Sequence, residues 1–196
     1  MSHRELPPAQ AQRLMPEGQA LLHSPARSAL REAAAALDLA ERYQQPLEMS
    51  LALAQMARCY RALQALGPAE LVLERALAWA RILGAADQAV EILCLLAETS
   101  CSVAELHAQD DSRRCHAALE RTRDWAFEAT GMATRVADPQ WEIKVLLRIS
   151  DVLDRCGDHD DAVELQSRAM RLMYGTHTSA DTAQAPLLDV RRLGDA

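Results

Sequence analysis

The stretch LALAQMARCYRALQALGPAELVLERALAWA, residues 51–80, decides the fold class, because its pattern of small residues recurs along the chain. Within it, Ala69, Ala76 and Ala80 stand seven and then four residues apart. Similar sets recur in steps of 40, 53 and 40 residues, and the four sets are Ala29–Ala36–Ala40, Ala69–Ala76–Ala80, Thr122–Ala129–Ala133 and Ala162–Ala169–Met173. Self-similarity at such a period is typical of stacked helical repeats, which generally act by binding other molecules.

The composition also favours helices. The 196 residues are 49% apolar, 25% charged and only 4% aromatic, and Ala and Leu, both strong helix formers, dominate the apolar set. No stretch alternates polar and apolar residues with β-branched enrichment, which a half-buried strand would need. The sequence therefore predicts an all-α fold.

Proline and glycine divide the chain into about seven helices joined by short turns. We expect antiparallel helix pairs, because Ala lets two backbones approach where they cross while Leu fills the groove beside the crossing. The expected helices are residues 25–45, 46–66, 68–83, 86–108, 112–136, 139–156 and 160–174, with a weak further helix at 187–193. In this interpretation residues 1–18 are an irregular leader, 19–176 the repeat domain and 177–196 a polar tail.

These features resemble tetratricopeptide repeats over residues 26–175. The resemblance is carried by residues 51–80 and by LLRISDVLDRCGDHDDAVELQSRAM, residues 146–170, in which Gly157, Ala162 and Ala169 occupy the family's glycine and small-residue positions. The family period is about 34 residues, so the chain is more similar to the longer-repeat variety of bacterial regulators and adaptors. The resemblance implies an α-α superhelix, a solenoid.

Thirteen extra residues separate the second and third small-residue sets, between Ser100 and Thr122. Because neither helical pattern is interrupted, we expect one hairpin to be lengthened by about two turns per helix, or ~10 Å. Such an arm either touches a partner or a second copy of the chain, or only packs on itself.

In the resembled family, the first helix of each pair lines a concave groove. Carried over by position, the implied groove residues are Gln55, Arg58, Arg61, Glu98, Lys144, Arg148, Asp151 and Arg155. Four of them, Arg58, Arg61, Lys144 and Arg148, suggest a local basic strip. Because Arg binds carboxylates through two hydrogen bonds, an acidic peptide or protein segment is the expected ligand. The alternative is a solvated face on which these cations pair with acidic residues of the same chain.

Charge and cysteine content bear on partners and compartment. The net charge of −7 argues against nucleic-acid binding, and no apolar run approaches membrane-spanning length. There is no secretory signal at the start of the sequence, and an odd number of five cysteines without framework spacing is typical of reduced thiols. We therefore expect a cytoplasmic protein.

No residue pattern indicates chemistry at a reactive centre. Cys101, His107, Cys115 and His116 lack the tight pairs of a zinc site, and residues 157–164 are better explained as an acidic helix start than as a cation loop. No phosphate-binding glycine loop or nucleophile motif occurs. The sequence predicts no enzyme, no cofactor and no metal.

The sequence is compatible with two functions. The first is a non-catalytic protein-interaction module whose groove binds a peptide or acidic segment. The alternative is a ligand- or peptide-responsive regulator related to the helical domains of bacterial signalling and transcription regulators. A homodimer is a further expectation, because the array shows no polar cap at either end.

Overall fold

The computed structural model describes residues 24–136 and 138–183, which form seven helices and no strand. The expected all-α fold is confirmed. The expected leader and the weak helix at 187–193 lie outside the described residues. The helices are α2 (Pro25–Arg42), α3 (Pro46–Ala62), α4 (Leu66–Leu83), α5 (Ala86–His107), α6 (Ser112–Ala133), α7 (Pro139–Arg155) and α8 (His159–Ala183).

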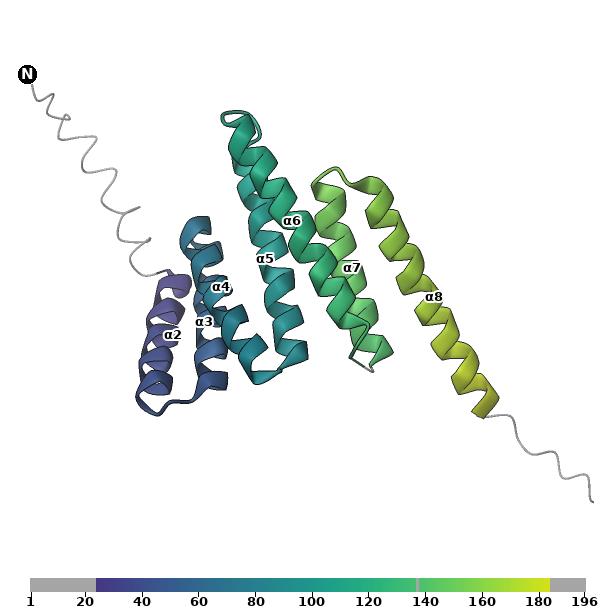
Figure 1. Cartoon of the computed structure of the whole chain (residues 1–196), viewed down its shortest axis with the longest axis horizontal. Helices are drawn as coiled ribbons and strands as arrows, with labels where there is room; N and C mark the ends of the chain where they lie inside the picture. The colour runs from purple at the N-terminus through teal and green to yellow at the C-terminus, as the bar shows by residue number, and fades with distance from the viewer. Residues whose placement is uncertain (1–23, 137, 184–196) are drawn as a thin grey trace, which may run out of the picture.

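The helices stand in two rows (Figure 1). Helices α3, α5 and α7 form one row, and α2, α4, α6 and α8 form the other. Each helix packs against the next along the chain, and α5 also packs directly against α7. The core therefore lies between the rows.

Alanines are buried where the helices cross, as the repeat pattern predicts. Seven alanines at the helix crossings are at most 2% exposed, and they are Ala57, Ala69, Ala76, Ala97, Ala129, Ala162 and Ala169. The Ser50 hydroxyl on α3 donates to the Ala76 carbonyl oxygen at 2.9 Å, which shows how closely α3 approaches the α4 backbone. Leucines such as Leu53, Leu73 and Leu93 fill the remaining space without exposure.

The first small-residue set, on α2, departs from this pattern. Ala33, Leu37 and Ala40 are buried, but Ala36 is exposed. Ala36 is the counterpart of Ala76, which faces the preceding helix α3. Among the described residues no helix precedes α2, and none of these residues covers Ala36.

Four helices end in the same type of turn. In the part of the chain that the structure describes, the residues with positive φ are Gln44, Gln64, Gly84 and Gly157, and each follows the end of a helix. After each, the next amide donates back to a carbonyl five residues earlier, as from Gln45 to Ala40 at 2.9 Å. This geometry satisfies the last carbonyls of a helix. It ends α2 and α3 three and four residues earlier than expected, because glutamine adopts the left-handed conformation that glycine more often provides at a helix end.

Other helix boundaries also differ from the sequence prediction. Gly67 was expected to separate two helices and Pro68 to begin the second, yet both lie in the first turn of α4, where proline's missing N–H costs nothing. Gly175 was expected to stop the last helix, but α8 continues to Ala183. A helical glycine costs about 1 kcal/mol and does not by itself force a stop.

The lengthened hairpin is present. Helix α5 continues 14 residues past Leu93, whereas α3 continues nine past the equivalent Leu53. Helix α6 begins ten residues before Thr122, whereas α4 begins three before Ala69. The extra five and seven residues correspond to roughly 7–10 Å, and the arm rises beyond its neighbours in Figure 1.

The crossing at Ala76 gives a stability test. Ala76→Leu should overpack the contact with α3 and lower the free energy of unfolding by about 1–3 kcal/mol. Ala78→Leu is the matched control, because Ala78 lies on the same helix but is exposed. Urea denaturation measures both, and equal midpoints for the two variants would contradict the packing described here.

Candidate interaction surface

Three carboxylates follow one face of α5. Glu91, Glu98 and Glu105 are spaced seven residues apart, so they stack two helical turns from one another. We call these residues the glutamate column. Arginines from the neighbouring helices of the same row, Arg58 and Arg61 on α3 and Arg148 and Arg155 on α7, reach the column from both sides.

The ion pairs join three helices. Arg58 Nη2 lies 3.0 Å from Glu91 Oε1, and Arg61 Nη1 lies 2.5 Å from Glu98 Oε2. From the other side, Arg148 Nη1 lies 2.7 Å from Glu91 Oε2, while its Nε donates to Glu98 Oε1. Arg148 therefore bridges two members of the column and ties α7 to α5.

Glu98 is the best-satisfied carboxylate of the column. Its side chain is 16% exposed, and each oxygen accepts from a different arginine. Burial alone would raise the pKa of Glu98, but the hydrogen bonds and charges of Arg148 and Arg61 outweigh that effect and lower it. The carboxylate is therefore ionised in the folded protein at neutral pH and contributes to holding the row together.

Glu105 forms the end of the column nearest the arm. Arg155 donates to it through Nε at 3.0 Å and through Nη2 at 2.8 Å, which is the forked contact that guanidinium groups favour. This pair is more exposed than the pairs around Glu98, so it adds less stability.

The eight implied groove residues lie on the expected row of helices. Five of them belong to the ion-pair network just described. Gln55, Lys144 and Asp151 are exposed, and within the part of the chain that the structure describes no ion pair joins Lys144 or Asp151 to another residue. The arginines are thus paired within the chain with the glutamate column, and the charge of Asp151 also acts on Arg155.

Glu91 and Glu105 were missed in the sequence analysis. Their signal was available, because both stand seven residues from Glu98, which the family resemblance had implied. The basic strip inferred from Arg58, Arg61, Lys144 and Arg148 becomes a surface of nearly balanced charge once the glutamate column is included. An acidic ligand would have to compete with glutamates that already hold these arginines.

Exposed leucines flank the network on the same row. On α3, Leu47 and Leu51 are 46% and 47% exposed, and Leu51 precedes Gln55 by one turn. On α7, Leu147 is 44% exposed and lies between Lys144 and Asp151 on one face. The row therefore presents apolar side chains at its α3 and α7 edges with ion pairs between them.

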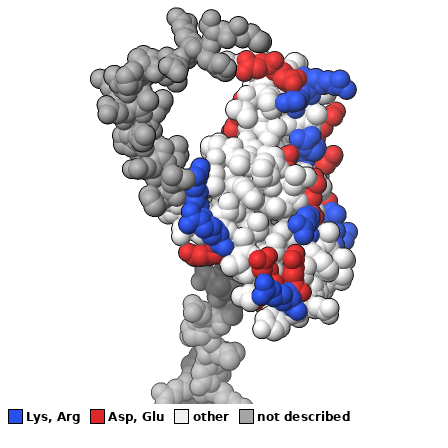
Figure 2. Space-filling model, turned by 90° about the vertical axis from the view of Figure 1, so that its left-hand side faces the viewer, with Lys and Arg blue, Asp and Glu red and all other residues white. Residues whose placement is uncertain are grey.

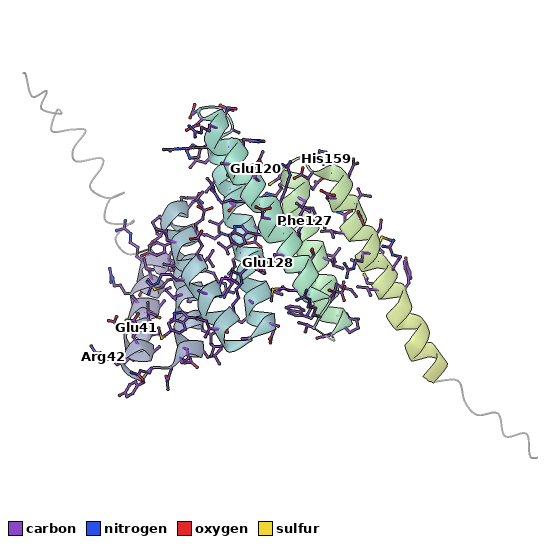
Figure 3. The ribbon with its side chains drawn as sticks, viewed as in Figure 1. Glu41, Arg42, Glu120, Phe127, Glu128 and His159 are labelled. Carbon is purple, nitrogen blue, oxygen red and sulfur yellow. The ribbon has the colours of Figure 1, made fainter. Side chains whose placement is uncertain are left out.

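The second row is also joined by ion pairs. Arg81 on α4 bonds to Glu128 on α6, which is labelled in Figure 3. Arg121 on α6 reaches Glu70 on α4 at 3.5 Å. Adjacent repeats are thus linked on both sides of the core.

The described residues contain no group of three or more His, Cys, Asp or Glu side chains arranged to hold a metal ion. Nor does any helix in the described part of the chain have the length and apolar character needed to cross a bilayer.

No family model and no curated protein matches the sequence. Among solved structures, a chain of the DHF58 filament matches with 23% identity and a TM-score of 0.50, covering 80% of this chain and 83% of that one. The DHF79 filament matches with 20% identity, a TM-score of 0.42 and coverage of 76% and 82%. BtubC (BKLC) from P. vanneervenii matches with 16% identity, a TM-score of 0.28 and coverage of 96% and 95%. The likeness to the DHF58 filament concerns the helical fold alone.

Glu98 predicts a pH-dependent stability difference. Its pKa is lowered on folding, so its contribution is complete above the unfolded value of about 4.3 and is lost as pH falls through the folded value. Glu98→Gln should therefore destabilise the protein by about 1–3 kcal/mol at pH 7, and by progressively less below about pH 4.

Glu164→Gln is the matched control for this measurement, because Glu164 is exposed and outside the network. Urea unfolding of the wild type and both variants at several pH values gives the comparison. A gap for Glu98→Gln that stays constant from pH 7 to pH 3 would show that the charge is not the cause.

Proposed function

We propose that this chain is a non-catalytic protein-interaction module of the tetratricopeptide-like kind. It binds a segment of a partner protein across the α3, α5 and α7 row. The observation that carries the proposal is the combination of exposed leucines with unpaired polar side chains on both edges of an ion-paired surface. A group of exposed apolar side chains with polar residues around it is typical of a protein interaction site.

The ion-pair network supports binding by rigidity. Arg61, Arg148 and Glu98 are each held by charged partners, so they lose little freedom when another molecule covers them. A surface that is already ordered incurs a smaller entropy cost on binding. The ion-paired side chains therefore form a rigid surface. The side chains available for new contacts are those next to it, such as Leu51, Leu147 and Lys144.

The unpaired charges specify the partner more closely. Lys144 and Asp151 lie seven residues apart on α7, which separates them by about 10 Å along the helix. The matching partner segment carries a carboxylate and a cation at that spacing, with apolar side chains directed at Leu147 and Leu51. A purely acidic segment fits less well, because the arginines are already neutralised.

Self-association is a second candidate, favoured by the two end helices. Leu39 on α2 and Tyr43, which directly follows α2, are 52% and 72% exposed, and Val163 and Met170 on α8 are 59% and 52% exposed. Figure 2, which views the molecule from the α2 side, shows a broad area without charged side chains. The DHF58 chain belongs to a filament, which is compatible with stacking of this fold through its ends.

The binding proposal predicts a loss of affinity when the leucine edges are charged. Leu51→Glu combined with Leu147→Glu should raise the Kd for the partner at least about tenfold, equivalent to 1.4 kcal/mol. The partner is first captured by in-cell cross-linking to the wild-type protein, and its recombinant segment is then titrated. Ile82→Glu is the control, because Ile82 is 73% exposed but lies on α4 in the other row. Equal affinity of the double variant and the wild type would exclude this face.

The self-association proposal predicts a concentration-dependent mass. Sedimentation of the wild type should show species larger than the monomer at high concentration, and Leu39→Glu with Tyr43→Glu should return the protein to a monomer, because the charges prevent an apolar contact. Leu106→Glu, 64% exposed near the arm tip, is the comparison. If Leu106→Glu disrupts assembly and the α2 variant does not, the arm is the contact. A wild type that stays monomeric throughout removes the proposal.

A further inference from the structure

Two thiols from separate helices meet at the end of the core nearest the arm. Cys101 on α5 has no exposed surface, and Cys156 caps the C-terminus of α7 and is partly buried. Both belong to the same hydrophobic cluster, of which Cys101 is a buried member and Cys156 a packed neighbour. Both sulfur atoms are present as free thiols.

Contacts on both sides fix the two cysteines opposite each other. Cys101 Sγ lies 3.8 Å from the carbonyl oxygen of Val152, one helical turn before Cys156. One turn beyond Cys101, Glu105 accepts hydrogen bonds from Arg155, the residue next to Cys156. The Cys156 amide donates to this same Val152 carbonyl oxygen at 3.1 Å, so Cys101 Sγ and the Cys156 backbone both contact one oxygen atom where α5 packs against α7.

The two thiols differ in acidity. The hydrogen bond from Cys101, assisted by Thr122 and the charge of Arg155, lowers the pKa of Cys156 against the effects of burial and Asp158. The same thiol–thiol hydrogen bond, together with burial, raises the pKa of Cys101. Cys156 is therefore the thiol that ionises more readily, and it is also the more accessible of the two.

We propose that Cys101 and Cys156 are an oxidation site that closes into a disulfide between α5 and α7 when the protein meets hydrogen peroxide. The Cys156 thiolate attacks one peroxide oxygen, the O–O bond breaks, and the departing hydroxide takes a proton to become water. The sulfenic acid formed on Cys156 is then attacked by the Cys101 sulfur. The S–O bond breaks, and the leaving hydroxide with the Cys101 proton forms a second water.

The balance is two thiols and one peroxide giving one disulfide and two waters. A disulfide needs Cα atoms about 4.4–6.8 Å apart, and the contacts with the Val152 carbonyl bring α5 at Cys101 near the C-terminal end of α7. The bond would lie beside the Arg155–Glu105 pair, at the arm end of the α3, α5 and α7 row. Oxidation would thus lock the relative position of two helices that the ion pairs hold reversibly.

The test uses the full chain, reduced and then treated with a small excess of hydrogen peroxide at low protein concentration. Alkylation, intact mass and peptide mapping follow. The expected product has two fewer titratable thiols, has lost ~2 Da as the two thiol hydrogens leave, and contains one linked peptide pair carrying residues 101 and 156. Treatment with dithiothreitol should restore both thiols.

Three variants make the outcome decisive. Cys115→Ser should still give the 101–156 link, because Cys115 is also partly buried but lies on α6 and is not part of the hydrophobic cluster that contains both Cys101 and Cys156. Cys156→Ser and Cys101→Ala should each abolish it, and either one suffices if the other fails to fold by circular dichroism. The proposal is overturned by a link through Cys59, Cys94 or Cys115, by disulfide-bonded dimers, or by peroxide products on Cys156 with no link to Cys101.

Discussion

Each helix pair in this chain can close only because a small side chain stands where the two backbones cross. Ala76 shows the constraint directly, since the Ser50 hydroxyl reaches its carbonyl oxygen across the α3–α4 contact. A larger side chain would separate the helices and break the leucine packing on either side. The rest of the molecule follows from these crossings, because they set how near each helix lies to the next and therefore which long side chains meet.

Helix α5 shows the consequence for the surface. It packs against α4, α6 and α7, and the arginines of α3 reach over its remaining side. Almost all of its middle is buried, which leaves the glutamate column as its polar face. A partly buried carboxylate is costly unless it is paired, and arginine has the length to reach it from a helix one position away. The ion pairs are thus a response to the packing, and they give the row a fixed surface beside which leucines and unpaired charges remain available.

Much of the fold could be predicted from the sequence, because small-residue spacing and helix-terminating signals act locally. The buried alanines and the lengthened hairpin both follow from such signals. Glutamine in place of glycine at Gln44 and Gln64 hid two helix ends, since turn geometry depends on backbone conformation as well as residue type. Gly175 misled in the opposite sense, because a glycine weakens a helix without ending it.

The candidate surface could be predicted only in part. The resemblance placed Arg58, Arg61 and Arg148 on one row. The net charge of the surface around them, however, depends on which residues face them from another helix. Glu91 lies 33 residues from Arg58 and 57 from Arg148 in the sequence, so no local sequence pattern predicts either ion pair. The proximity of Cys101 and Cys156 was hidden for the same reason, because it arises from the packing of α5 on α7.

A double-mutant cycle between Arg148 and Glu98 tests most directly that these helices form one surface held by the column. The free energy of unfolding is measured at pH 7 for the wild type, Arg148→Gln, Glu98→Gln and the double variant. A shared, partly buried ion pair should give a coupling energy of at least about 1 kcal/mol. Effects that add within about 0.3 kcal/mol would mean that the two side chains act independently, and that the α3, α5 and α7 row is not held together in this way.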